Sequence, residues 1–191
     1  MPKPILQKEE KVLRKVAKEI PVKDIKTPKI QKILKEMSLS LKSQDDGVAI
    51  AAPQIGYSLR IFVVAGKVFS DGFAELREEK INRIEENLLN QVAGKDNRPV
   101  VEKDMVFINP KISKLSRDKD WMPEGCLSVR PIYGKTWRSK KALVTAYDEN
   151  GKKFTRGAAG LLAQIFQHET DHLNGILFID HAKDLKEEKL P

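Results

Sequence analysis

The spacing of apolar side chains predicts two helices near the start of this 191-residue chain. Residues 9–19 place apolar side chains as a short amphipathic helix does, and Pro21 would end it. A second helix is expected to begin after Thr27, because Thr is a favourable N-cap and Pro28 suits the first helical position. We expect this helix to end at the turn sequence of residues 45–47. Its apolar face comprises Ile30, Ile33, Leu34, Met37 and Leu41.

Short apolar runs predict β-strands in the rest of the chain. Residues 60–64 are expected to form a buried strand, and residues 105–112 a strand that returns to the same sheet. Residues 142–155 predict a β-hairpin, because two strand-like runs flank an Asn-Gly turn. Residues 176–179 predict a last short strand.

The period of the apolar pattern changes once more before the C-terminus. Residues 161–172 predict one long helix, which Asn174-Gly175 would end. Strands ahead of one late helix indicate an α+β fold, with antiparallel β-sheets packed around a central C-terminal helix. Residues 66–104 are rich in charge and too few for a core of their own. We therefore expect a single domain over residues 1–191, with an inserted excursion at about 66–104.

Composition adds little beyond a broad class. The chain is 40% hydrophobic and 32% charged, an ordinary globular profile, and no apolar run approaches the ~18 residues of a membrane span. Its first residues become charged before a signal-peptide core could form, so a cytoplasmic protein is expected. The net charge of +8 favours work near an anionic surface such as RNA, but simple solubility explains it equally well.

The predicted late helix contains an H-E-x-x-H sequence. His168 and His172 lie one helical turn apart on one face, where they can bind one divalent metal ion. Glu169 lies between them, within reach of a water molecule held on that ion. The motif supplies two ligands and a base, so the third ligand must come from elsewhere in the chain.

Two other stretches contain residues suited to chemistry. Cys126 is the only cysteine, so it forms no internal disulfide; it could be a small buried residue, a nucleophile or a metal ligand. Residues 47–56 are small and uncharged, and Gln54 is their only polar side chain. A tightly packed turn with a hydrogen-bonded Gln is the simpler explanation of that run.

Three stretches together resemble the peptide deformylase family: residues 47–54, 124–128 (Glu-Gly-Cys-Leu-Ser) and 167–172. The resemblance implies a metal-dependent hydrolase that removes the formyl group from the N-terminal formylmethionine of nascent polypeptides. One alternative is a zinc endopeptidase with the same motif, although such enzymes take a third ligand downstream, whereas Cys126 lies upstream. A second alternative is a non-catalytic module associated with the ribosome, in which Glu169 would be dispensable.

The resemblance assigns a role to each residue of the centre. Cys126 as thiolate, with His168 and His172 as neutral imidazoles, would hold one divalent ion and leave a position for water. This ligand set accepts Fe(II), Zn(II), Ni(II) or Co(II), and the resemblance implies Fe(II) in cells. Structural zinc fits less well, because such a site normally has a fourth protein ligand, and the chain has no second Cys and only His181 as a further His. A nucleophilic Cys126 also fits less well, because it leaves Glu169 and the second His without a role.

Catalysis would need a base and oxyanion donors. Glu169 would accept a proton from the water that attacks the formyl carbon and later protonate the departing amine. By family analogy, the Gln54 amide and the Leu127 backbone N–H donate hydrogen bonds to the developing oxyanion.

Further residues follow from the same resemblance. Glu124 and Arg138 are expected to form a buried salt bridge that positions the cysteine loop. Asp171 is expected to support the metal ligands without binding the ion itself. The resemblance places four residues around the methionine side chain of the substrate: Val48, Ala49, Leu161 and Ile165.

The chain departs from the family pattern at two positions. Ala49 replaces a usual Gly beside the peptide path, and Tyr133 replaces an Arg implicated in substrate contact. The tail after His181 is shorter than the helix with which compact members dock on the ribosome. The expected partners are therefore N-formylmethionyl nascent peptides and, by a route left open, the ribosome. We expect no membrane partner and no recognition of a specific nucleic-acid sequence.

Overall fold

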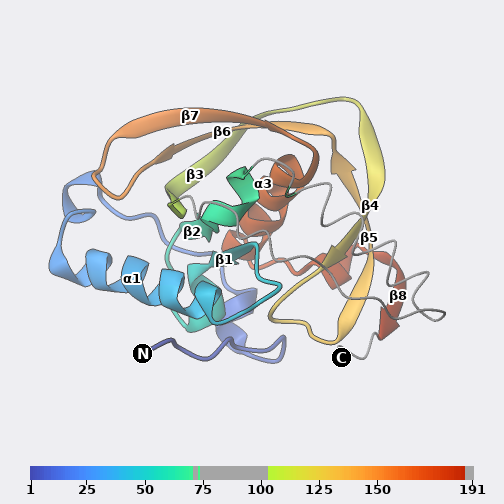
Figure 1. Cartoon of the computed structure of the whole chain (residues 1–191), viewed down its shortest axis with the longest axis horizontal. Helices are drawn as coiled ribbons and strands as arrows, with labels where there is room; N and C mark the ends of the chain where they lie inside the picture. The colour runs from blue at the N-terminus through green and yellow to red at the C-terminus, as the bar shows by residue number, and fades with distance from the viewer. Residues whose placement is uncertain (71–72, 74–102, 188–191) are drawn as a thin grey trace.

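Two antiparallel β-sheets and two α-helices make up the described part of the molecule (Figure 1). The computed structural model describes residues 1–70, 73 and 103–187. The first sheet has strand order β1-β2-β3-β6-β7, and the second has order β4-β5-β8. The strands are β1 (Ala49–Ala51), β2 (Ile61–Val64), β3 (Met105–Leu115), β4 (Lys119–Gly125), β5 (Ile132–Ser139), β6 (Lys141–Tyr147), β7 (Lys153–Ala159) and β8 (Lys183–Glu187).

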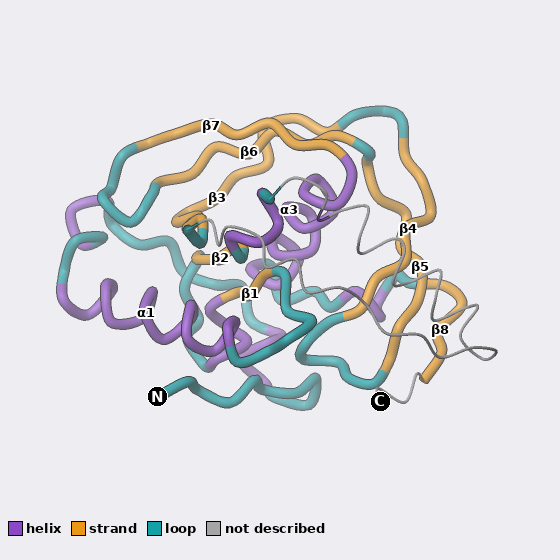
Figure 2. The backbone as a smooth tube through the Cα atoms, viewed as in Figure 1, coloured by secondary structure: helices purple, strands orange, loops and turns teal. Residues whose placement is uncertain are grey.

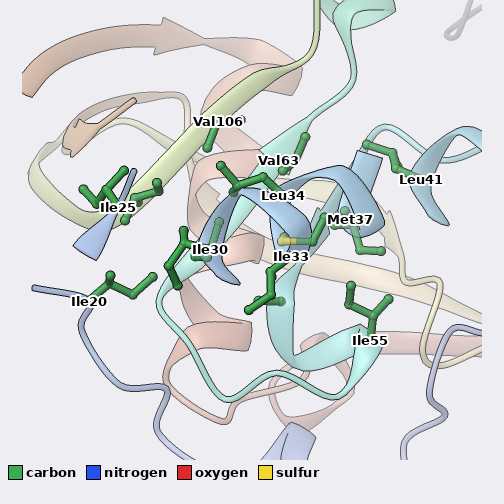
Figure 3. Packing of buried hydrophobic residues seen from close by; sticks show 14 of the residues in the cluster. Ile20, Ile25, Ile30, Ile33, Leu34, Met37, Leu41, Ile55, Val63 and Val106 are labelled. Atoms are coloured by element: carbon green, nitrogen blue, oxygen red, sulfur yellow. The ribbon is translucent and has the colours of Figure 1, made fainter. Parts of the chain in front are cut away.

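Helix α1 (Pro28–Lys42) begins where the sequence predicts. Thr27 takes the extended N-cap conformation and Pro28 occupies the first helical position, where a missing N–H costs nothing. The helix ends at Lys42, slightly before the predicted turn. Its expected apolar face is buried, and Figure 3 shows these side chains packed against Val63 and Val106 of the sheet.

The first sheet separates two apolar layers because successive strand residues point to opposite faces. In β2, Ile61 and Val63 join the cluster beneath α1, whereas Phe62 and Val64 join the cluster around α3. β3 repeats this alternation: Ile108 faces the first cluster and Phe107 the second. β1 and β2 are therefore covered by a helix on each face, which explains why all their residues are buried, whereas β7 is mostly exposed.

Helix α3 (Gly160–Leu173) lies against the concave side of the first sheet (Figure 2). It contacts β1, β2, β3, β6 and β7 of that sheet and also β5 of the second. Phe166 anchors it, with its ring centroid 5.1 Å from that of Phe107. The α+β class with antiparallel sheets is as the sequence predicts.

Gly175 follows the end of α3 and allows a close backbone crossing. Its φ is +75°, and a Cβ built there would lie 2.8 Å from the backbone of Arg14. Only glycine tolerates both conditions.

Two predicted elements are wrong. Residues 9–19 form only a 3₁₀ turn at Lys11–Arg14, because the N–H groups of Ala17 and Lys18 donate to Leu173 and Ser58 instead of closing helical turns. Residues 176–179 form no strand: the Leu177 N–H donates to the Asp180 side chain, and a 3₁₀ turn (Phe178–Asp180) follows.

The expected excursion at 66–104 lies mostly outside the described residues. Within the part of the chain that the structure describes, no helix has the length and apolar character needed to cross a membrane.

Candidate metal centre

Three side chains of the H-E-x-x-H sequence lie together on α3. The ring centroids of His168 and His172 are 4.8 Å apart, one helical turn from each other. Glu169 and His172 are almost completely buried, with exposed fractions of 4% and 1%. Buried polar groups of this kind are uncommon without a partner.

Cys126 approaches this helix from the segment that follows β4. Its Sγ lies 3.2 Å from His172 Nε2, and the Ser128 backbone N–H donates to it over 3.4 Å. The potential ligand atoms of Cys126, His168 and His172 all lie within 4.8 Å of one another. The structure thus brings together a thiol and two imidazoles that are 42 and 46 residues apart in the chain (168 − 126 and 172 − 126).

A carboxylate fixes the tautomer of His168. Its Nδ1 lies 2.6 Å from Glu124 Oε1, and an ionised carboxylate only accepts hydrogen bonds. Nδ1 therefore carries the proton, which leaves the lone pair of Nε2 free to bind a metal ion.

Glu124 is held in its ionised form. Burial raises its pKa, but the hydrogen bonds from His168 and Arg138, together with the positive charge of Arg138, outweigh burial and hold the pKa well below its usual range. Arg138 Nη2 donates to Glu124 Oε1 over 2.7 Å, and both side chains are buried. Arg138 also donates to Asp171 Oδ2 over 2.6 Å, so hydrogen bonds connect Asp171 through Arg138 and Glu124 to His168.

Two residues that the sequence did not indicate complete the Glu124 environment. Thr136 Oγ1 donates to Glu124 Oε2 over 2.5 Å, and Gln164 Nε2 donates to the same oxygen over 3.2 Å. Gln164 also donates to the carbonyl of Pro123 over 2.8 Å. Neither residue belongs to the three stretches singled out above, and only the fold brings them to the carboxylate.

The environment of Glu169 differs from that of Glu124. Burial raises its pKa to about 7, and no hydrogen-bond partner for its Oε2 exists among the described residues. His172 Nδ1 likewise lacks a partner in the described part of the chain, and burial lowers the pKa of this imidazole. An unpaired buried carboxylate beside three ligand atoms is typical of a site that holds further atoms.

The side chain of Gln54 also lies next to Cys126. Its Oε1 accepts the Ala51 backbone N–H over 2.8 Å, which orients the amide. Its Nε2 donates to Ser128 Oγ over 3.1 Å and lies 3.6 Å from Cys126 Sγ. The side chain is hydrogen-bonded, as the simpler explanation requires, and its NH₂ group also faces the centre.

Leu127 is anchored by its carbonyl, which accepts from Gln7 Nε2 over 3.2 Å. Its backbone N–H donates to no other described residue.

The four residues expected around a methionine side chain share one apolar cluster. Ala49 and Ile165 are buried, and Val48 and Leu161 pack partly buried against the same cluster. Ala49 lies in β1 and is not among the residues with positive φ, so its methyl group causes no backbone strain there. Tyr133 packs over Gly125, where an added Cβ would lie 2.4 Å from its ring.

The donor set fits a divalent transition-metal ion. Metal–ligand bonds to Cys and His are ~2.0–2.3 Å long, so bound ligand atoms lie only a few ångströms apart, as they do here. One sulfur and two nitrogens suit Zn(II), Fe(II) and similar ions better than Mg²⁺ or Ca²⁺.

The family described as "Polypeptide deformylase" matches residues 2–188. The chain belongs to this family. Peptide deformylase 2 of Clostridium acetobutylicum is 36% identical over 172 residues, which cover 90% of this chain and 89% of that protein.

Solved deformylase structures share the fold. A peptide deformylase from Legionella pneumophila is 30% identical with a TM-score of 0.71, over 96% of this chain and 88% of that one. A class I type b peptide deformylase from Acinetobacter baumannii, bound to Met-Ala-Ser, is 25% identical with a TM-score of 0.72. That match covers 95% of this chain and 99% of the other.

As a peptide deformylase, the chain is a hydrolase of protein biosynthesis that removes the N-formyl group from nascent polypeptides. The family is metal-dependent, and the Cys126, His168 and His172 cluster is a candidate site for its metal ion. The family match decides against the zinc endopeptidase and the non-catalytic module.

Proposed function

We propose that Cys126, His168 and His172 hold one divalent metal ion and that Glu169 moves the protons of deformylation. One observation carries this proposal: three ligand atoms within 4.8 Å of one another lie next to a buried, unpaired carboxylate in the described residues. A bound ion supplies Lewis acidity at the reacting carbonyl and water.

Glu169 is suited to both proton transfers of the reaction. With a pKa raised to about 7, its carboxylate can accept a proton from the attacking water near neutral pH. The same carboxyl group then returns that proton to the departing amine nitrogen. The products are formate and a peptide with a free N-terminal amine, so one water molecule is consumed.

We propose that the Gln54 amide and the Leu127 backbone N–H donate hydrogen bonds to the carbonyl oxygen as it gains negative charge. The Ala51 N–H fixes the Gln54 amide so that its donor side faces Cys126, and the Leu127 N–H lies in the adjoining segment. Donors that are already oriented need no rearrangement during the reaction, which is why one such group lowers the barrier by ~3 kcal/mol.

The apolar cluster beside the centre is suited to a methionine side chain. Val48, Ala49, Leu161 and Ile165 all belong to it or pack against it, and the Acinetobacter baumannii relative binds a peptide that begins with methionine. We propose that the substrate lies against these four residues, with its formyl group toward Glu169.

The surrounding hydrogen bonds are suited to keeping the ligands in place. The Glu124 carboxylate holds His168 in the tautomer that leaves Nε2 free, and Arg138 ties Glu124 to Asp171. We propose Fe(II) as the metal used in cells, with Zn(II), Ni(II) or Co(II) as substitutes, since a thiolate with two imidazoles accepts each of them.

We further propose that the chain is a single catalytic domain that acts on nascent peptides in the cytoplasm. The family match over residues 2–188 supports one domain, with the 66–104 excursion inserted in it.

Replacement of Glu169 by Ala tests the proposal. We expect the variant to keep its metal ion and to deformylate formyl-Met-Ala about 10²–10⁴-fold more slowly, since proton transfer is lost. Exposed Glu19, replaced by Ala in the same way, should have no effect and provides the matched control. Full activity of the Glu169→Ala variant under anaerobic metal reconstitution would contradict the mechanism.

A further inference from the structure

The second sheet has an outer face that the metal centre does not use. Residues paired across antiparallel strands share a face, and Trp121 of β4 pairs with Trp137 of β5. The neighbouring residues Glu124, Thr136 and Arg138 point the other way and contact one another next to the ligands. The alternation of the strands therefore places both tryptophans on the side away from the centre.

Both tryptophans are exposed to solvent. Trp121 is 37% exposed and Trp137 is 49% exposed, and their ring centroids lie 5.3 Å apart. A cross-strand aromatic pair stabilises a sheet, but that role does not require both residues to stay exposed to water. Exposed aromatic rings of this size are typical of contact surfaces.

Lysines surround the ring pair. Lys183 Nζ lies 4.7 Å from the centroid of the Trp121 ring, and Lys183 pairs across the sheet with Lys135. One carboxylate lies near these lysines: Asp184 Oδ2 is 4.0 Å from Lys135 Nζ. We define the Trp121–Trp137 face by the exposed residues Lys119, Trp121, Lys135, Trp137, Lys183 and Lys186.

We propose that the Trp121–Trp137 face binds single-stranded RNA. Bases stack on exposed aromatic rings whatever their sequence, and lysines along the same face neutralise the phosphates between them. A β-sheet with exposed rings and basic side chains is a recurrent arrangement for this purpose. The chain's net charge of +8 attracts a polyanion to this face.

RNA fits this face better than a lipid surface does. Membrane-bound surfaces insert several aliphatic side chains, whereas the exposed residues of this face offer two indole rings among four lysines. The two rings lie on neighbouring strands, 5.3 Å apart and tilted by 47°, and each offers its own exposed surface to a base of an unpaired strand, whereas the bases of a duplex are stacked on each other.

The tryptophans themselves provide the measurement. The chain contains two tryptophans in all, Trp121 and Trp137, so its tryptophan fluorescence reports on this face alone. We expect an oligouridylate of about 12 nucleotides to quench this emission in a saturable way. If four lysines contact phosphates, the slope of log affinity against log salt should be about −3.

Variants separate binding from folding. Trp121→Ala should weaken binding about tenfold while Trp137 still reports it, and Trp137→Ala should do the same with Trp121 as reporter. Lys183→Glu keeps both rings and should also weaken binding, whereas Lys29→Glu on the exposed side of α1 should not. Deformylation of formyl-Met-Ala should stay unchanged in the Trp121→Ala and Lys183→Glu variants.

Several results would overturn the proposal. The proposal is wrong if the oligouridylate does not quench the tryptophan emission at low salt. It is also wrong if duplex RNA of the same length quenches the emission equally. Quenching by phosphatidylserine vesicles or by polyglutamate, with none by RNA, would assign the face to a membrane or to an acidic protein. A change of emission on dilution alone would assign it to a second copy of this chain.

Discussion

Glu124 lies outside the H-E-x-x-H motif, yet its carboxylate orients His168 of that motif. The H-E-x-x-H spacing predicted two ligands, His168 and His172, and the resemblance to peptide deformylases added Cys126 as the third. The donors that hold Glu124 were not all predictable: Thr136 and Gln164 are ordinary polar residues until the fold brings them within 2.5 and 3.2 Å of Glu124 Oε2. The sequence therefore indicated the three candidate ligands, which the structure brings within 4.8 Å of one another, but it did not indicate all the residues that orient them.

A change at Gln54 tests the oxyanion donor. In Gln54→Glu the carboxylate still accepts the Ala51 N–H, but the donor that faces Cys126 is gone. We expect deformylation to slow about 10²–10³-fold, with KM changed much less than kcat, because the lost hydrogen bond forms only in the transition state. Steady-state kinetics with formyl-Met-Ala measure this split. A rise in KM with unchanged kcat would mean that Gln54 only binds substrate.

At the scale of elements, success and failure of prediction have separate causes. Helix α1 was predicted closely because its cap, its proline and its apolar stripe agree. Strand β8 was not predicted: all five of its residues are exposed, and only pairing with β5 makes it a strand. The helix predicted at 9–19 failed because backbone bonds to distant Leu173 and Ser58 replaced local ones. Long-range backbone hydrogen bonds of this kind produce no periodic pattern of apolar residues in the sequence.

The link between α3 and β4 leads to a prediction about Gln164. Its amide donates both to Pro123 O and to Glu124 Oε2, so it fixes the end of β4 relative to the metal ligands. We expect Gln164→Leu to weaken metal affinity about tenfold, as loss of such outer hydrogen bonds does. Competition with a chelator for Co(II) gives the affinity directly.

Gln31 provides a matched control for this change. Its side chain also donates to two backbone carbonyls, those of Ile25 and Glu149, but it lies on α1 away from the centre. Gln31→Leu should lower stability without changing metal affinity. An unaltered chelator competition in Gln164→Leu would show that Gln164 is merely structural.

At the scale of the whole molecule, the proposed metal centre joins the two sheets. Cys126 follows β4 of the second sheet, whereas the two proposed His ligands lie on α3, which packs against the first. The α+β class was predictable from strands that precede one late amphipathic helix. The position of the first sheet between α1 and α3 was not predictable, because it depends on which strand residues pack against each helix.

Because the centre joins both sheets, metal removal should destabilise the fold as a unit. At a free metal concentration 100 times Kd, binding contributes about 2.7 kcal/mol. For a chain of this size we therefore expect chelation to lower Tm by roughly 5–10 °C. Thermal unfolding followed by circular dichroism, with and without chelator, measures the shift. A Cys126→Ser variant should show a smaller shift, and an equal one would argue that Cys126 is no ligand.

The ligand set itself is the most direct test of the account. X-ray absorption at the metal edge of the anaerobically loaded, full-length protein reports the atoms around the ion and their distances. We predict one metal ion per chain with one sulfur at ~2.3 Å, from Cys126, and two imidazole nitrogens at ~2.0–2.1 Å, from His168 and His172. A first shell without sulfur, or with only one imidazole, would contradict the proposed centre.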